Sequence, residues 1–184
     1  TLNKQNMIIA GYKQMVIYGI QINDAELMVK YIVPAMKVCK SANAHADLGV
    51  FNRLYGLYHL MKGNTKQAEE LFLRAIDIFS DSYNITNFNS ISIAASYNYL
   101  GEIRKTQRMY KEAMEYFEKS IDLCKKNGVM CLAIFYINAG KTLFLKKDME
   151  NSKKYFLMAK EIATEFYSYW KSVVIVAFLS LFSF

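Results

Sequence analysis

Two histidines and three cysteines are the residues of this 184-residue chain best suited to metal or redox chemistry. His45 and His59 stand fourteen residues apart, without an acidic or cysteine partner at the spacing of a zinc site. Cys39, Cys124 and Cys131 are an odd number without paired-cysteine spacing, and a glycine between the last two is expected to break a shared helix. We therefore expect packing roles for these side chains, with no metal site and no redox pair.

Motifs for catalysis are missing from the sequence as well. It contains no His-Glu-x-x-His, no glycine-rich phosphate loop and no Gly-x-Ser-x-Gly. We therefore expect no enzyme activity and no cofactor, which leaves recognition through basic and amide side chains. The formal net charge is +7, but lysines and arginines alternate with Asp and Glu along every segment. Without a clustered basic stripe, we do not expect this segment to bind nucleic acid.

The composition predicts long helices joined by short turns. There is one proline, the eight glycines are scattered, and hydrophobic residues make up 53% of the chain. The apolar run at residues 173–179 is well short of the roughly 20 residues that a spanning helix needs, so we expect a core helix and no membrane span. Because no secretory signal precedes the cysteines, we expect a reducing, cytoplasmic compartment.

Three segments of the chain superimpose when one glycine in each is taken as the origin. A small residue follows each glycine after twelve positions, and a phenylalanine follows four positions later. These offsets place the residues on one face of each of two consecutive helices, with turns at 62–65, 106–109 and 146–149. We expect the helices of a pair to cross closely at the small residues, and the phenylalanine to fill the space toward the next pair. The nine positions are Gly56, Ala68, Phe72, Gly101, Ala113, Phe117, Gly140, Ser152 and Phe156.

This spacing resembles the tetratricopeptide repeat, whose pattern is W-x2-L-G-x2-Y followed by A-x3-F. The clearest copy runs from Ala94 to Cys124 and contains Leu100-Gly101, Ala113 and Phe117. The resemblance implies an all-α fold, a right-handed α-solenoid of antiparallel helix pairs, and binding of a protein or peptide on its concave face. Other solenoids of helix pairs are the alternative.

We expect the whole chain, 1–184, to form one such array. Its pairs are predicted at 45–86, 87–127 and 128–165, with a degenerate first pair at 1–44 and an unpaired apolar helix at 166–184. Either Gly19 or the stretch around Ala25 can anchor the first pair. The glycines are 45 and then 39 residues apart instead of the family's 34, so the helices or the loops between pairs are longer.

The candidate ligand-binding residues lie beside the glycine stripe, on the first helix of each predicted pair. Arginine and lysine would hold a carboxylate or phosphate, and an asparagine would hydrogen-bond the backbone of an extended peptide. The alternative is that these are ordinary solvated side chains. The clamp of the family's chaperone-binding members is not reproduced, so that ligand is not carried over. The candidates are Arg53, Leu57, Asn98, Glu102, Lys105 and Lys141.

The long period, and the segment 93–105 in particular, resembles the repeat domains of bacterial transcriptional regulators and peptide-sensing signalling proteins. The resemblance implies a sensor module that transmits occupancy by a change in curvature, with a constitutive scaffold as the alternative. A start at Thr1 and an uncovered apolar tail favour a fragment of a larger regulator. We expect the tail from Trp170 to open a further pair, covered by the next repeat or by a second copy in a two-fold homodimer.

Overall fold

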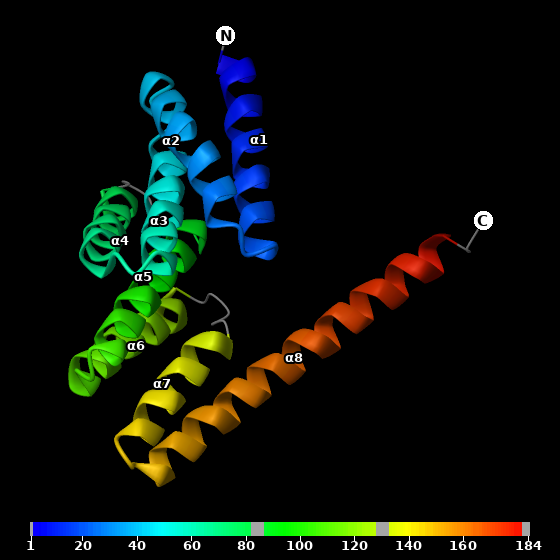
Figure 1. Cartoon of the computed structure of the whole chain (residues 1–184). Coiled ribbons are helices and arrows are strands. Elements are labelled where there is room, and N and C mark those ends of the chain that lie inside the picture. The colour runs from blue at the N-terminus through cyan, green and yellow to red at the C-terminus, as the bar shows by residue number, and fades with distance from the viewer. Residues whose placement is uncertain (1, 82–86, 128–132, 182–184) are drawn as a thin grey trace.

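The computed structural model describes residues 2–81, 87–127 and 133–181, and every regular element in these ranges is an α-helix. Figure 1 shows the helices stacked in chain order, with the last one projecting from the stack. They are α1 (Leu2–Gln21), α2 (Ala25–Ser41), α3 (His45–Met61), α4 (Thr65–Ser80), α5 (Asn87–Thr106), α6 (Tyr110–Lys126), α7 (Ala133–Leu145) and α8 (Met149–Leu181).

The helices pack as four consecutive pairs: α1 with α2, α3 with α4, α5 with α6, and α7 with α8. Each second helix also packs on the first helix of the next pair, so the pairs share one continuous core. The first helices contact one another along the stack, α1 with α3, α3 with α5 and α5 with α7. The fold is therefore the all-α solenoid that the sequence predicted, and its odd-numbered helices line one side.

The pairs α3–α4, α5–α6 and α7–α8 carry the repeated glycine, and we call them the template pairs. The same tight turn connects the two helices in each of them. Its central residue adopts a positive φ, at 77° for Gly63, 62° for Arg108 and 66° for Lys147. The next amide donates to the carbonyl five residues earlier, at 2.8–3.0 Å, which satisfies an otherwise unpaired acceptor at the helix end. These turns lie in the segments predicted to contain them, and Asn23 (φ 56°) and Asn43 (φ 52°) adopt the same conformation earlier in the chain.

The template glycines lie directly against the template phenylalanines. A Cβ atom on Gly101 would lie 2.5 Å from Cε1 of Phe117, and one on Gly56 would lie 2.7 Å from Cε1 of Phe72. A side chain at either position would therefore overlap the ring. This confirms that the two helices of a pair cross closely at the glycine.

The turn of the first pair places Val16 at the position that the glycine has in the later pairs. In the template pairs the positive-φ residue follows the glycine by seven positions, and the same count back from Asn23 leads to Val16. Val16, Met28 and Ile32 are fully buried, at the positions of glycine, alanine and phenylalanine. Gly19, three positions later, also lies close to α2, because a Cβ atom there would be 3.0 Å from Cγ of Met28. The larger Val16 is accompanied by a smaller Ile32, and the glycine–phenylalanine motif is lost.

The predicted break near residue 165 does not occur. Helix α8 has 33 residues and continues from Met149 to Leu181, so residues 166–181 extend it and do not begin a new helix. Residues 160–172 contain neither glycine nor proline to end the helix. Within the described ranges the close backbone contacts of α8 are with α7, and Tyr155 also packs on the core that contains Phe117 of α6. The C-terminal half of α8 projects away from the stack (Figure 1). Residues 182–184 lie outside the described part of the chain.

Candidate functional site

The odd-numbered helices carry the predicted binding residues on what we call the inner face. Each pair has a reference residue, which is Val16 in the first pair and the template glycine in the others. The inner face comprises the residues that stand three positions before, one position after and four positions after this reference residue. Three residues come from each helix: Lys13, Ile17 and Ile20 on α1; Arg53, Leu57 and Leu60 on α3; Asn98, Glu102 and Lys105 on α5; Ile137, Lys141 and Phe144 on α7.

Arg53 is half-buried on α3, and its Nε atom is buried without a hydrogen-bond partner among the described residues. Burial lowers the pKa of its guanidinium, an effect that the nearby Tyr99 opposes. Leu57, one turn further along, is partly buried and packs on the core formed by α1 to α4.

Asn98 lies between helices and not on an open surface. It is 6% exposed, and its Oδ1 accepts a hydrogen bond of 3.1 Å from Nδ2 of Asn138 on α7. This amide pair joins the second and third template pairs. The bond uses one acceptor site of the Asn98 amide, and its predicted bond to a peptide backbone stays a prediction.

Lys105 and Lys141 meet at a pocket of about 440 Å³. Its other wall residues are Phe144 and Leu145 on α7 and Phe156 on α8. Lys105 forms an ion pair with Glu102 one turn away on α5, and its side chain is only 14% exposed. Lys141 is exposed, so its ammonium group is accessible from outside. The structure thus brings two of the predicted residues together, while Arg53 and Asn98 are not part of this wall.

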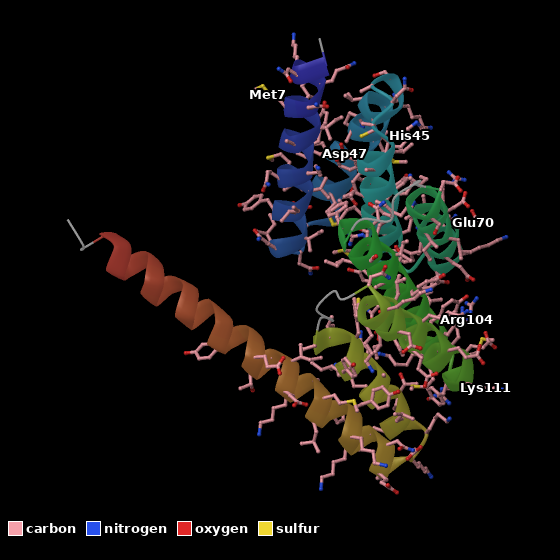
Figure 2. The ribbon with its side chains drawn as sticks, turned by 180° about the vertical axis from the view of Figure 1, so that it is seen from behind. Met7, His45, Asp47, Glu70, Arg104 and Lys111 are labelled. Atoms are coloured by element: carbon pink, nitrogen blue, oxygen red, sulfur yellow. The ribbon has the colours of Figure 1, made fainter. Side chains whose placement is uncertain are left out.

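Lys13 is an inner-face residue that sequence reasoning missed. It occupies on α1 the position of Arg53 on α3, and its Nζ lies 2.7 Å from Oδ1 of Asp47, which Figure 2 labels. Because residue 16 is a valine and not a glycine, the glycine pattern did not show that Lys13 is equivalent to Arg53. The turn residue Asn23 was the signal that could have revealed it, because it fixes the register of the first pair.

Arg104 on α5, labelled in Figure 2, connects three helices. Its guanidinium contacts both carboxylate oxygens of Glu69 on α4, and Nε lies 3.2 Å from Oε2 of Glu112 on α6. The side chain is 16% exposed. A bidentate arginine and carboxylate pair fixes geometry as well as charge, so Arg104 ties one pair to the previous one.

His59, Cys39 and Cys124 take part in packing, whereas His45 is exposed. His59 lies against the rings of Tyr55 and Tyr58, with centroids 4.6 and 5.1 Å away, and burial lowers its pKa. Burial raises the pKa of the Cys39 thiol to about 11. No cluster suited to a metal ion occurs among the described residues, and Cys131 lies outside them.

Comparison with protein families decides what this stack is. A family model described as tetratricopeptide repeat matches residues 47–126, which contain α4 to α6 and most of α3, and a second with the same description matches 133–166. The chain belongs to the tetratricopeptide repeat family. The repeats make it a protein–protein interaction module, in a family whose members are typically non-catalytic scaffolds. A search of curated proteins found no match. None of the described helices is both long and apolar enough to cross a membrane.

Proposed function

We propose that the inner face binds a segment of a partner protein, centred on the pocket between α5 and α7. The pocket is the observation that carries the proposal. Phe144, Leu145 and Phe156 supply apolar walls, Lys141 supplies an exposed positive charge beside them, and Lys105 lies there as an ion pair with Glu102. A volume of about 440 Å³ accommodates an apolar side chain, and a neighbouring carboxylate would pair with the ammonium group of Lys141. The chemistry favours a segment in which an apolar residue stands next to an acidic one or to the C-terminal carboxylate.

Arg53 supports a longer contact along the same face. Its guanidinium is partly buried on α3, which lies two odd-numbered helices before α7 and Lys141. A carboxylate or backbone carbonyl of the bound segment would satisfy this group. Such a segment would run across α3, α5 and α7.

Selection from a displayed library of random 16-residue peptides tests this function. We expect the recovered peptides to bind the parent and to lose about tenfold in affinity on Lys141→Glu, because an exposed charge in a binding groove acts on recognition. Lys111→Glu makes the same change of charge on α6, on the side of the stack away from the projecting end of α8 (Figure 2). Equal affinities for the two variants would move the site off the inner face.

We propose further that the array is the sensor part of a larger regulator, as its resemblance to bacterial regulators implies. Three contacts between successive pairs support long-range coupling: Lys13 with Asp47, Arg104 with Glu69, and Asn98 with Asn138. A constitutive scaffold is the second candidate, since the same contacts stiffen the stack. Hydrogen exchange with a selected peptide separates the two. A sensor changes protection in α1 and α2 when the α5–α7 pocket is filled, whereas a scaffold changes it only at the contact.

A further inference from the structure

The last pair exposes a surface that the inner pairs cover. We call it the end face and define it by Phe144 on α7 and by Lys153, Phe156 and Lys160 on α8. Phe156 is 38% exposed, although the equivalent Phe72 and Phe117 are fully buried. Phe144 is 55% exposed, whereas Leu60, its equivalent on α3, is partly buried against the next pair.

The inner pairs show what such a surface packs against. Phe72 is covered by Leu100 and Ile103 of α5, three positions apart, and by the ring of Tyr99 at a centroid distance of 4.9 Å. Ala139 and Leu143 of α7, four positions apart, pack in the same way on Phe117. The cover is therefore a helix with apolar residues spaced at i and i+3 or i+4. Within the described ranges no such helix lies on α8, whose close backbone contacts are with α7 and whose Tyr155 reaches Glu118 of α6.

Two lysines change the chemistry of the end face. Lys153 takes the position of Met114, which is 8% exposed on α6, and Lys160 takes the position of Ile121, which is 4% exposed. Both lysines are exposed. A purely apolar covering helix would bury these ammonium groups without partners, at a high cost in desolvation. The end face therefore favours a cover that carries carboxylates.

The position of Lys153 also has a charged precedent inside the stack. Its equivalent on α4 is Glu69, which is held by Arg104 of the covering helix α5. At the end face the charge on the second helix is inverted. The complementary covering helix would carry Asp or Glu where α5 carries Arg104.

We propose that the end face binds an acidic amphipathic helix of a separate protein. Two apolar residues of this helix pack on Phe144 and Phe156, and its carboxylates pair with Lys153 and Lys160. This is recognition of a helix in a groove, with the repeat's own packing as the template. The end face shares Phe144 and Phe156 with the pocket of the proposed function, and the inference also rests on that function in taking the partner to be a protein.

Charge complementarity assigns the face to another protein and not to a second copy. In head-to-tail stacking of two copies, α1 would take the place of the covering helix. Helix α1 contains Lys4 and Lys13 but neither Asp nor Glu. The apolar extension at 166–184 also contains neither, so neither of these two segments of a second copy brings a carboxylate.

A pair of helical peptides tests the proposal. Both copy residues 95–107, whose Leu100 and Ile103 cover Phe72, and both are held helical by a hydrocarbon staple on the opposite side. One keeps Arg104 and the other has Arg104→Glu. Fluorescence anisotropy with the full chain should show the glutamate peptide binding about tenfold more tightly. On Lys153→Glu the preference should reverse. Lys66→Glu, an equally exposed change on α4, should leave it unaltered.

Three results would overturn the proposal: equal affinities for the two peptides, binding of neither, or a preference that Lys153→Glu leaves in place. A fourth result would come from sedimentation of the parent chain. If the parent forms a dimer that the glutamate peptide does not dissociate, the end face is occupied by a second copy. Circular dichroism confirms that each variant folds. The proposed function fails separately, since its library peptides depend on Lys141 and should bind Lys153→Glu as they bind the parent.

Discussion

The α5–α6 pair and the α7–α8 pair share one template and differ in what covers them. In both, a phenylalanine lies against a glycine of the preceding helix. Phe117 is fully buried because α7 covers it, whereas Phe156 is 38% exposed. The motif therefore fixes packing within a pair, while the following helix decides how much apolar surface is removed from water. A repeat in a solenoid obtains part of its stability from its neighbour.

Replacing Phe117 or Phe156 with alanine should give the largest difference in lost stability between the two pairs. Phe117→Ala leaves a cavity in a closed core and should lower the free energy of unfolding by about 3–5 kcal/mol. Phe156→Ala removes a ring that is already partly in water, so we expect about 1–2 kcal/mol. Urea unfolding followed by circular dichroism measures both. Equal losses would mean that the end pair is covered in solution.

Replacing Gly101 or Gly140 with alanine should give a smaller difference in lost stability between the two pairs. A Cβ atom on Gly101 meets the closed ring of Phe117 at 2.5 Å, and overpacking of this kind costs about 1–3 kcal/mol. On Gly140 the nearest ring atom is 3.0 Å away, on the exposed Phe156 that has room to move. We expect Gly140→Ala to be near neutral, because alanine also favours the helix. Gly101→Trp should unfold much of the array, and melting at the parent temperature would show that the repeat register is wrong.

The ties between pairs should contribute less than the core. A double-mutant cycle with Arg104→Ala and Glu69→Ala should give a coupling energy of about 1 kcal/mol, because the pair is bidentate and partly buried. The single contact between Lys13 and Asp47 should give less, since both side chains are about one third exposed. A larger coupling for Lys13 would reverse our ranking of the covered and terminal regions.

The smallest effect concerns pH. Burial holds the pKa of His59 below its usual value of 6.5, so the unfolded chain binds more protons than the folded chain as the pH falls. The contribution to stability is therefore complete above pH 6.5 and declines as the pH falls through the folded pKa. His59→Gln should flatten that part of the profile of stability against pH. An unchanged slope would assign it to other groups.

The sequence was sufficient for the template pairs because close helix crossing needs small residues at fixed spacing, as at Gly101 and Ala113. It was insufficient for the first pair, where Val16 and Ile32 take the positions of glycine and phenylalanine. The contact of Asn98 with Asn138 was missed because exposure on an odd-numbered helix depends on how the next pair is placed. The repeat spacing alone shows that Lys153 and Lys160 are equivalent to Met114 and Ile121. That these are normally covered positions follows only from the burial of Met114 and Ile121 in the structure.

Hydrogen exchange with the tightest peptide from the displayed library tests most directly whether the inner face is the binding surface. The account predicts slower exchange at the C-terminal turns of α5 and α7, around Lys105 and Lys141, where the pocket lies. Lys141→Glu should abolish this protection at the same peptide concentration. Protection confined to α2, α4 and α6, with none on the odd-numbered helices, would contradict the account.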